Sequence, residues 1–341
     1  MQLKVIHTTT EFEAMAAEWN ALLDCSASRV PFLRHEYLLA WWRLLGGGEW
    51  NEAELYIIAA QLADGALAAV APMFFSTNRD GLPALLLLGS IEISDYLDVL
   101  ICPEQMPAFV DALFDHLASP LAPSWKVLDF YNILETSPTL PILQTAAARR
   151  GWHYQQQRLH HCPYIPLPGD WETYLAGIDK KQRHEIRRKM RRAESSETPV
   201  RWYIVADKEQ LDTHIDDFLR LMELDPDKRA FLTSAMRAQL RAIIHAACAG
   251  GWLQLAFLEV GGEKAAAYLN FDYGGHIWVY NSGLDFRFGA LSPGWVLLGY
   301  LLQWANEHQR LAFDFMRGDE EYKYRFGAID RFIVRVCIQR A

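Results

Sequence analysis

The residues of this chain that are best suited to group-transfer chemistry lie together near its C-terminus. Asp314 closes a short apolar stretch, and Gly318 follows it as a turn residue. Tyr322 and Lys323 stand side by side shortly afterwards. This order predicts the end of a strand, a glycine turn and a short helix. An acidic residue, a phenol and an ammonium group carried on one such unit can build a transfer site.

The elements around this unit follow an α/β order that occurs twice along the chain. In each half a hairpin is followed by another strand, a helix and a short apolar strand. The closing strands 127–130 and 312–315 read Val-Leu-Asp-Phe and Ala-Phe-Asp-Phe at the same place in each half. The shared order favours a duplicated α/β unit, although two adjacent hairpins also arise by chance.

Hydrophobic periodicity and turn residues predict the bounds of these elements. In the first half we expect strand 3–7, helix 10–23 with Thr10 as its N-cap, helix 35–45, a hairpin of 55–62 and 66–75, strands around 84–101, helix 103–117 and strand 126–130. In the second half we expect an exposed basic helix 180–192, a hairpin of 252–260 and 264–272, strand 277–284, helix 292–308 and strand 311–315.

Length and composition favour two domains. The chain of 341 residues exceeds the roughly 250–300 residues that one hydrophobic core usually supports. A hydrophobic content of 51% supplies enough apolar material for sizeable cores. The proline-rich segment 163–170 suits a connector, so we expect an N-terminal domain at 1–165 and a C-terminal domain at 166–341.

Charge, hydropathy and cysteine usage bound the broad class of the protein. A net charge of −9 argues against a nucleic-acid coat. No apolar run approaches the ~20 residues that a membrane-spanning helix needs, and the N-terminus lacks the apolar core of a signal peptide. The cysteines are scattered and odd in number, which suits reduced thiols in a cytoplasmic protein. They are Cys25, Cys102, Cys162, Cys248 and Cys337.

The C-terminal unit resembles a known family. The pattern Asp314-Phe315-x-x-Gly318-x-x-x-Tyr322-Lys323-x-x-Phe326 resembles the end signature of the CelD/BcsL-type acetyltransferases within the GNAT superfamily. The segment 291–298, Leu-Ser-Pro-Gly-Trp-Val-Leu-Leu, resembles that family's loop-to-helix segment, and the basic helix stands where such proteins open their second unit. Related FemAB-type proteins, which transfer amino acids from aminoacyl-tRNA, share the tandem layout.

This resemblance implies an α/β (α+β) fold class with two tandem GNAT-like domains. Each domain would be a mixed, mostly antiparallel twisted sheet flanked by helices, and the first domain would be structural or acceptor-binding. The resemblance also implies acyl-CoA, most simply acetyl-CoA, as co-substrate and chemistry that uses no metal. The implied reaction moves the acyl group to an amine or hydroxyl of a small molecule or sugar, in envelope or exopolysaccharide synthesis.

The start of helix 292–308 is the expected donor site. Ser292 is a natural N-cap, Pro293 fits the first helical position, and Gly294 lets a ligand approach the backbone. The free N–H groups and partial positive charge of a helix N-terminus suit a pyrophosphate, although an ordinary helix start carries the same residues. With the resembling segment included, the expected cofactor-binding residues are Leu291, Ser292, Gly294 and Trp295.

Tyr322, Lys323 and Asp314 are the expected catalytic residues. In a GNAT-type reaction a tyrosine hydroxyl, with a pKa near ~10, can protonate the leaving thiolate. Lys323 could stabilise oxyanion charge or hold an anionic acceptor, and Asp314 or Asp319 could orient Lys323 or the acceptor amine. In the alternative, Tyr322 is packed, Lys323 is solvated and Asp314 only caps the turn.

The basic helix has three interpretations. Its eight Lys and Arg residues against one Glu supply affinity for anions. The helix could contact coenzyme A phosphates or an anionic glycan, hold tRNA as in FemAB-like proteins, or form a solvated face. Arg317 could likewise meet a phosphate or form a surface salt bridge. The expected substrate- or anion-binding residues are Arg183, Arg187, Arg188, Arg317 and Asp319.

Two rival functions stay open at this point. The same fold could use aminoacyl-tRNA as donor in the FemAB manner, or it could be a non-catalytic tandem-GNAT that binds a partner. A metal site is not expected at His160, His161 and Cys162, because successive residues on a strand point to opposite faces.

Overall fold

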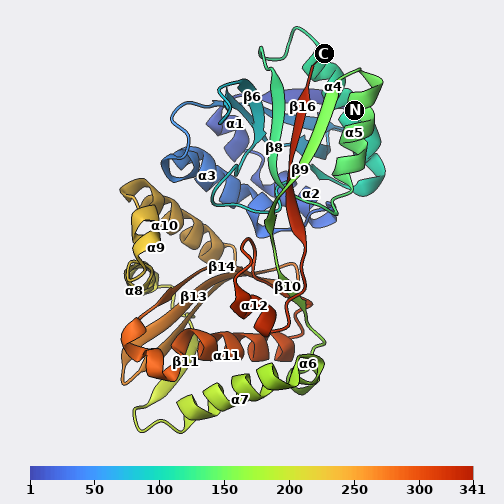
Figure 1. The fold of residues 1–341 in the computed structure, drawn as a ribbon. Helices are drawn as coiled ribbons and strands as arrows, with labels where there is room; N and C mark the ends of the chain where they lie inside the picture. The colour runs from blue at the N-terminus through green and yellow to red at the C-terminus, as the bar shows by residue number, and fades with distance from the viewer. Residues whose placement is uncertain (341) are drawn as a thin grey trace. The chain divides into compact units, whose positions relative to one another are not determined.

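The computed structural model describes residues 1–340, which form two compact units. Unit 1 contains Met1–His160 together with the C-terminal segment from Phe332, and unit 2 contains His161–Arg331. The division differs from the expected domains 1–165 and 166–341, because the last strand of the chain returns to the sheet of unit 1 (Figure 1).

Unit 1 is built on two sheets, and the hairpin expected at 55–62 and 66–75 contributes strands to both. Its first sheet has the order β1 (Gln2–Ile6), β3 (Ile57–Gln61), β4 (Leu67–Ala71) and β7 (Leu100–Ile101). Its second sheet has the order β2 (Glu54–Leu55), β5 (Met73–Thr77), β6 (Pro83–Leu87), β8 (Val127–Leu134), β16 (Phe332–Gln339) and β9 (His153–His161).

Pro72 marks the place where the chain passes from one of these sheets to the other. The expected strand 66–75 is interrupted there, so that β4 pairs with β3 and β5 pairs with β6. Proline has no N–H to give to a ladder, which makes it a natural point for a strand to change partners. The strands expected around 84–101 do not pair with each other, since β6 joins β5 and β8 while β7 joins β4.

Helices cover the sheets of unit 1. Their bounds are α1 (Thr9–Glu13), α2 (Ala16–Cys25), α3 (His35–Gly48), α4 (Met106–Ala118) and α5 (Thr139–Arg149), with short 3-10 turns η1 (Pro31–Leu33) and η2 (Pro103–Gln105). The expected helix 10–23 is two helices, and Thr8, not Thr10, is the N-cap, since its hydroxyl accepts the N–H of Glu11 at 3.2 Å. The glycine turn after residue 45 is present, with Gly46 and Gly47 at positive φ.

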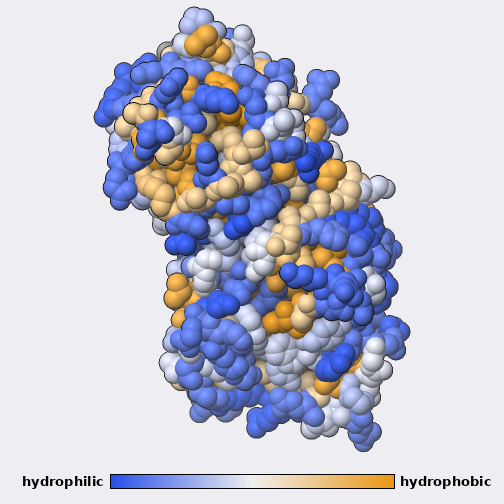
Figure 2. Space-filling view, turned by 180° about the vertical axis from the view of Figure 1, so that it is seen from behind, coloured by the Kyte–Doolittle hydropathy of each residue, from blue (hydrophilic) through white to orange (hydrophobic). Residues whose placement is uncertain are grey.

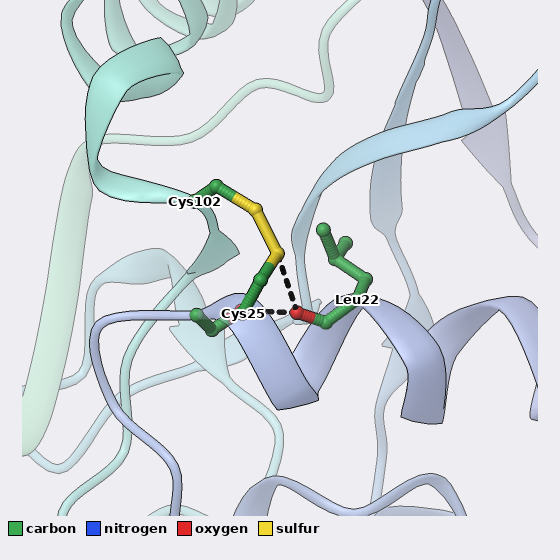
Figure 3. The surroundings of a disulfide bond; sticks show 4 residues. Leu22, Cys25 and Cys102 are labelled. Carbon is green, nitrogen blue, oxygen red and sulfur yellow. Dashed lines mark hydrogen bonds between the residues drawn. A yellow bond between two sulfur atoms is a disulfide. The ribbon is translucent and has the colours of Figure 1, made fainter.

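A disulfide joins Cys25 and Cys102 in unit 1 (Figure 3). The expectation that all five thiols are reduced is therefore wrong, and it no longer supports a cytoplasmic location. The two cysteines are 77 residues apart in sequence, but α2 packs beside β7 and brings their Cα atoms to 5.3 Å. This proximity depends on tertiary packing, which cysteine spacing alone does not reveal. Cys162, Cys248 and Cys337 keep their thiols and take no part in a disulfide.

Unit 2 is built on one mixed, mostly antiparallel sheet with helices on both faces (Figure 1). The strand order is β10 (Tyr164–Pro166), β15 (Ala312–Asp314), β14 (His276–Leu284), β13 (Glu263–Tyr273), β12 (Leu253–Val260) and β11 (Val200–Ile204). The helices are α6 (Trp171–Gly177), α7 (Lys180–Glu194), α8 (Leu211–Met222), α9 (Pro226–Phe231), α10 (Ser234–Ala249), α11 (Pro293–Glu307) and α12 (Glu321–Arg325), and the 3-10 segment η3 (Phe286–Leu291) precedes α11.

Two apolar cores hold these helices against the sheet of unit 2. The first core combines α6, α7 and α11 with one face of the sheet, where Ile186, Leu297 and Phe313 are buried. The second core combines α8 and α10 with the other face, where Phe218 and Phe257 are buried. Amphipathic helices on both faces of a twisted sheet are the expected arrangement for an α/β domain, and the predicted α/β fold class is confirmed.

Strands β14 and β15 separate after a short parallel contact. Residues 276–278 of β14 pair with 312–314 of β15, and β14 then continues to Leu284 without that neighbour. A register shift opposite Leu269 and Asn270 bends β14 in the same region. The separation exposes the edge of β14 beside the start of α11.

The duplication predicted from the sequence is visible in the pairing of the two closing strands. β8 pairs in parallel with β6, and β15 pairs in parallel with β14. Each closing strand also carries a fully buried aspartate that forms an ion pair with an arginine. Asp129 pairs with Arg335, and Asp314 pairs with Arg331.

The surface seen in Figure 2 is largely hydrophilic and is interrupted by separate apolar patches. Among the described residues, each helix is too short or too polar to cross a bilayer.

Candidate functional site

A pocket of about 270 Å³ opens in unit 2 where α11 begins, and we call it the α11 pocket. It lies beside the exposed edge of β14, with η3 and α12 completing its walls. Four residues expected from the sequence line it, namely Ser292, Gly294, Trp295 and Tyr322. The other lining residues are Tyr268, Ser282, Leu284, Asp285, Phe286, Gly289, Pro293 and Leu298.

The first turn of α11 faces this pocket with its backbone uncapped. Ser292 occupies the N-cap position in the left-handed region (φ 51°, ψ 54°), and its side chain makes no capping hydrogen bond within the described chain. The expectation that its hydroxyl caps the helix is therefore wrong. Pro293 has no N–H and Val296 donates to the carbonyl of Ser292, so the N–H groups of Gly294 and Trp295 are the ones a ligand can reach.

Gly294 is required by packing. A Cβ at this position would lie 2.6 Å from Cδ2 of Leu284, which also lines the pocket. The absence of a side chain therefore keeps the end of β14 close to the start of α11. Leu291, the fourth expected cofactor-binding residue, packs against the core and is not part of the pocket wall.

Trp295 connects the pocket to the basic helix α7. The Nζ of Lys189 lies 4.0 Å from the centre of the indole ring, and the ring of Phe326 lies 4.6 Å from it. A cation held over the face of tryptophan is attracted by the ring's electron density. The contact positions this wall of the pocket and places one positive charge near it.

Tyr322 presents a protonated phenol to the pocket. Burial raises the pKa of Tyr322 well above its ordinary value, and Tyr268 and Glu320 add to the increase. Burial also raises the pKa of Tyr268, which lines the same pocket from β13. Both phenols therefore stay neutral and able to donate a hydrogen bond or a proton throughout the physiological pH range.

Lys323 points away from the pocket and into the protein. Only 3% of the residue is exposed. Its Nζ donates to the carbonyl oxygens of Arg317 and Gly318, each at 2.9 Å, and forms an ion pair with Glu320 at 2.8 Å. The carbonyl oxygen of Phe315 lies 3.4 Å from the same Nζ. Because these acceptors occupy all N–H bonds of the ammonium group, Lys323 braces the loop between β15 and α12 instead of facing a ligand.

Asp314 is also directed into the structure. It is fully buried, forms an ion pair with Arg331, and accepts the N–H of Met316 at 2.8 Å. The turn-capping alternative considered for this residue describes its contacts well. Of the three expected catalytic residues, the structure thus brings Tyr322 alone to the α11 pocket.

The remaining expected residues lie apart from that pocket. Asp319 is exposed, and Arg317 is partly exposed in the loop that Lys323 braces. On α7, Arg183 donates to the carbonyl oxygens of Leu175 and Ala176. These contacts fasten the end of α6.

The other two arginines expected to bind anions have carboxylate partners. Arg187 pairs with Glu172, and Arg188 pairs with Glu185 through two hydrogen bonds of 2.8 Å. Exposed pairs of this kind contribute little to stability and can exchange partners when a stronger anion arrives.

A second cavity, of about 690 Å³, lies between α7 and α12, and we call it the α7–α12 cavity. It contains Arg188 of the expected set but neither Arg183 nor Arg187. Its lining residues are Lys181, Gln182, His184, Glu185, Arg188, Glu321 and Arg325. Arg325 and Glu321 come from the helix that carries Tyr322, so the cavity and the α11 pocket border the same short helix.

The described chain contains no group of three or more His, Cys, Asp or Glu residues placed to hold a metal ion. On β9, His161 pairs with Asp330, and Cys162 is buried directly after the strand. In the run His160-His161-Cys162, His161 is thus held by an ion pair and Cys162 is packed inside the protein.

Part of unit 2 is similar to a known protein family. Residues 180–324 match the model of the Acetyltransf_6 family, described as an acetyltransferase (GNAT) domain. No curated protein matches the sequence.

Among solved structures, FemX is similar with a TM-score of 0.65 and 12% identity, over 98% of this chain and 97% of that chain. A conserved protein of unknown function from Bacteroides thetaiotaomicron has a TM-score of 0.60 and 12% identity, over 99% and 100%. L-PGS from Bacillus licheniformis has a TM-score of 0.55 and 13% identity, over 95% and 91%. At these identities the structures show a shared fold, and the chain carries a stretch similar to a GNAT acetyltransferase domain within it.

Proposed function

We propose that unit 2 is an acyltransferase that moves an acyl group from acyl-CoA, most simply acetyl-CoA, to an amine or hydroxyl. The observation that carries the proposal is the α11 pocket, in which an uncapped helix start and the protonated phenol of Tyr322 share one small cavity. This pocket falls within the residues that match the GNAT acetyltransferase model.

The residues present fit a coenzyme A thioester. The N–H groups of Gly294 and Trp295, with the partial positive charge of the α11 N-terminus, suit a pyrophosphate. The side chains of Leu284, Phe286 and Leu298 give the wall an apolar surface that suits the uncharged arm of the cofactor. The bound co-substrate would supply the reactive thioester.

Tyr322 would act on the leaving sulfur. An acceptor nitrogen attacks the thioester carbon and forms the C–N bond, while the C–S bond breaks and its electron pair passes to sulfur. Tyr322 gives its proton to that sulfur, the acceptor nitrogen releases a proton to water, and Tyr322 regains a proton from solvent. General acid catalysis of this type contributes typically about 10²–10⁴-fold to a rate.

For the acceptor we propose only a chemical class. A small molecule or a sugar suits a GNAT-type site, and the resemblance to CelD/BcsL-type proteins favours envelope or exopolysaccharide synthesis. Arg188 at the α7–α12 cavity is the member of the expected anion-binding set best placed to contact an anionic part of either substrate.

A second candidate function uses aminoacyl-tRNA as the donor. The similarity to FemX and the α7–α12 cavity with its Lys181, Arg188 and Arg325 favour it. A nucleotide phosphate is a natural ligand for such a cavity, and both donors carry one. The two candidates therefore differ in the donor and in the cavity that supports it, the α11 pocket for acyl-CoA and the α7–α12 cavity for aminoacyl-tRNA.

The test is calorimetry of acetyl-CoA binding to the wild type, to Gly289→Trp and to Gly177→Trp. Gly289 lines the α11 pocket, and a Cβ there meets no atom within 4 Å, so a tryptophan can fill the pocket without disturbing the core. Gly177 is equally open but lies at the end of α6, so its variant is the matched control.

We expect the wild type and Gly177→Trp to bind acetyl-CoA with similar affinity, and Gly289→Trp to bind at least about tenfold more weakly. If neither acetyl-CoA nor longer acyl-CoA compounds bind the wild type, the acyl-CoA proposal fails. Transfer activity that ribonuclease treatment abolishes would then establish the tRNA-dependent alternative.

A further inference from the structure

Ser282 is a polar group in the otherwise largely apolar α11 pocket, and a lysine from a distant part of the sequence contacts it. Ser282 lies on the edge of β14 and lines the pocket. Lys228, on the short helix α9, places its Nζ 2.5 Å from the carbonyl oxygen of Ser282 and 3.3 Å from its hydroxyl oxygen.

The hydrogen-bond directions leave the serine proton free to enter the pocket. An ammonium group is always the donor, so the Ser282 hydroxyl accepts from Lys228 and its own O–H must point elsewhere. Within the described residues, that O–H has no acceptor, while the backbone N–H of Ser282 bonds to Oδ1 of Asn281 at 2.8 Å. A serine that accepts from a cation is a stronger donor toward a ligand, because the two hydrogen bonds polarise each other.

Burial lowers the pKa of Lys228, whereas the carboxylates of Asp225 and Glu320 raise it. Glu320 forms an ion pair with Lys323, so its carboxylate acts electrostatically on both lysines. Lys323 spends its donors on backbone carbonyls and on Glu320, so of these two lysines Lys228 is the one that contacts a polar residue lining the pocket.

We infer that Ser282 donates a hydrogen bond to the carbonyl oxygen of the acyl group, and that Lys228 is the positioning residue that orients and polarises Ser282 for this contact. As the acceptor nitrogen attacks, the carbonyl π electrons move onto that oxygen, and they return when the C–S bond breaks. A donor aimed at the growing negative charge favours this step. The inference rests on the proposed acyl-CoA function. It assigns to Ser282 the stabilisation of the oxyanion that the sequence suggests for Lys323.

The experiment compares two ligands that differ by the carbonyl oxygen. Acetyl-CoA has a carbonyl group next to sulfur, and S-ethyl-CoA has a CH₂ group at the same position. The ratio of their dissociation constants therefore reports the contact to the carbonyl oxygen. Calorimetry would be performed on the wild type, Ser282→Ala, Lys228→Met and the double variant. The matched controls are Ser195→Ala and Lys208→Met, since both residues are exposed and lie outside the pocket.

We expect the wild type and both controls to bind acetyl-CoA about fivefold more tightly than S-ethyl-CoA, which corresponds to one ordinary hydrogen bond. Ser282→Ala and Lys228→Met should each remove most of this preference while affinity for S-ethyl-CoA is kept, and the double variant should lose no more than either single variant.

A preference that persists in Ser282→Ala, or that is absent from the wild type although both ligands bind, would overturn the inference alone. If the wild type binds neither ligand, the acyl-CoA proposal fails and this inference fails with it. Thermal melting of each variant shows whether a lost preference comes from lost folding, because a destabilised pocket weakens both ligands equally.

Discussion

Tyr322 and Lys323 are neighbours in sequence with opposite surroundings in the structure. Tyr322 faces the α11 pocket, and Lys323 turns inward to carbonyl and carboxylate partners. On a helix, consecutive residues lie about 100° apart, so adjacent side chains seldom share an environment. One of the pair is therefore suited to chemistry and the other to holding the loop that presents it.

Replacing Tyr322 with Phe should reduce turnover without weakening donor binding. The phenol supplies a proton in the proposed reaction, and its removal should lower kcat by about 10²–10⁴-fold. Steady-state release of the coenzyme A thiol measures kcat, and calorimetry measures acetyl-CoA affinity. Because the pKa of Tyr322 is raised, the wild type should keep this proton and lose no activity through it up to about pH 10. An unchanged kcat in the variant would remove Tyr322 from the mechanism.

Replacing Lys323 with Met should lower stability first. The change leaves the carbonyl groups of Arg317 and Gly318 and the carboxylate of Glu320 without their partner. We expect a loss of about 2–4 kcal/mol in the free energy of unfolding, measured by chemical denaturation. Lys208→Met is the exposed control and should change stability little. A fully stable Lys323→Met protein with low kcat would instead support a direct catalytic role.

The role of a residue could be predicted from the sequence where a few adjacent residues indicate it. The Ser-Pro-Gly start of α11 and the tyrosine of α12 are read from a few adjacent residues, and both border the pocket. Lys228 and Ser282 are 54 residues apart, and their contact exists because the tertiary fold brings the Lys228 side chain of α9 to β14. Neither composition nor spacing carries that information, and the same holds for the disulfide between Cys25 and Cys102.

At the scale of elements, β14 is positioned by close packing against α8. A Cβ on Gly283 would lie 2.7 Å from the backbone carbon of Leu221 and from the backbone nitrogen of Met222. These are backbone atoms that cannot move independently of the helix. Gly283 therefore sets the distance between α8 and the strand that carries Ser282.

Gly283→Ala should destabilise unit 2 because it forces α8 away from the sheet. We expect a loss of about 1–3 kcal/mol, as for other overpacking substitutions. Gly289→Ala is the matched control, since its new methyl group meets open space and should change stability little. Chemical denaturation measures the free energy of unfolding of Gly283→Ala and of Gly289→Ala. Equal values would show that α8 adjusts to the new methyl group without strain.

Element types were more predictable than element partners. Alternation and turn residues identified the hairpin of β12 and β13 and the helix α11 within a few residues. The division of one hairpin strand at Pro72 between two sheets is not predictable from the sequence, because residues 66–75 form one continuous apolar run on both sides of the proline. Sequence periodicity reports which face is buried, and pairing depends on segments that are far apart.

At the scale of the whole molecule, the disulfide links two segments of unit 1. A disulfide typically contributes about 2–4 kcal/mol to the free energy of unfolding. Denatured protein should titrate three thiols before reduction and five after it. Reduction, or Cys25→Ser with Cys102→Ser, should lower the free energy of unfolding by that amount. Five free thiols in the untreated protein would show that the bond does not form.

The position of β16 makes unit 2 a continuous insertion within unit 1. The strand lies between β8 and β9 in the sheet, yet it is formed by the last residues of the chain. During synthesis on the ribosome, all of unit 2 therefore emerges before the sheet of unit 1 can close. A chain without residues 332–339 would therefore contain all of unit 2, while β8 and β9 would lack the strand that lies between them. The sheet of unit 1 is thus completed by a segment that follows unit 2 in the sequence.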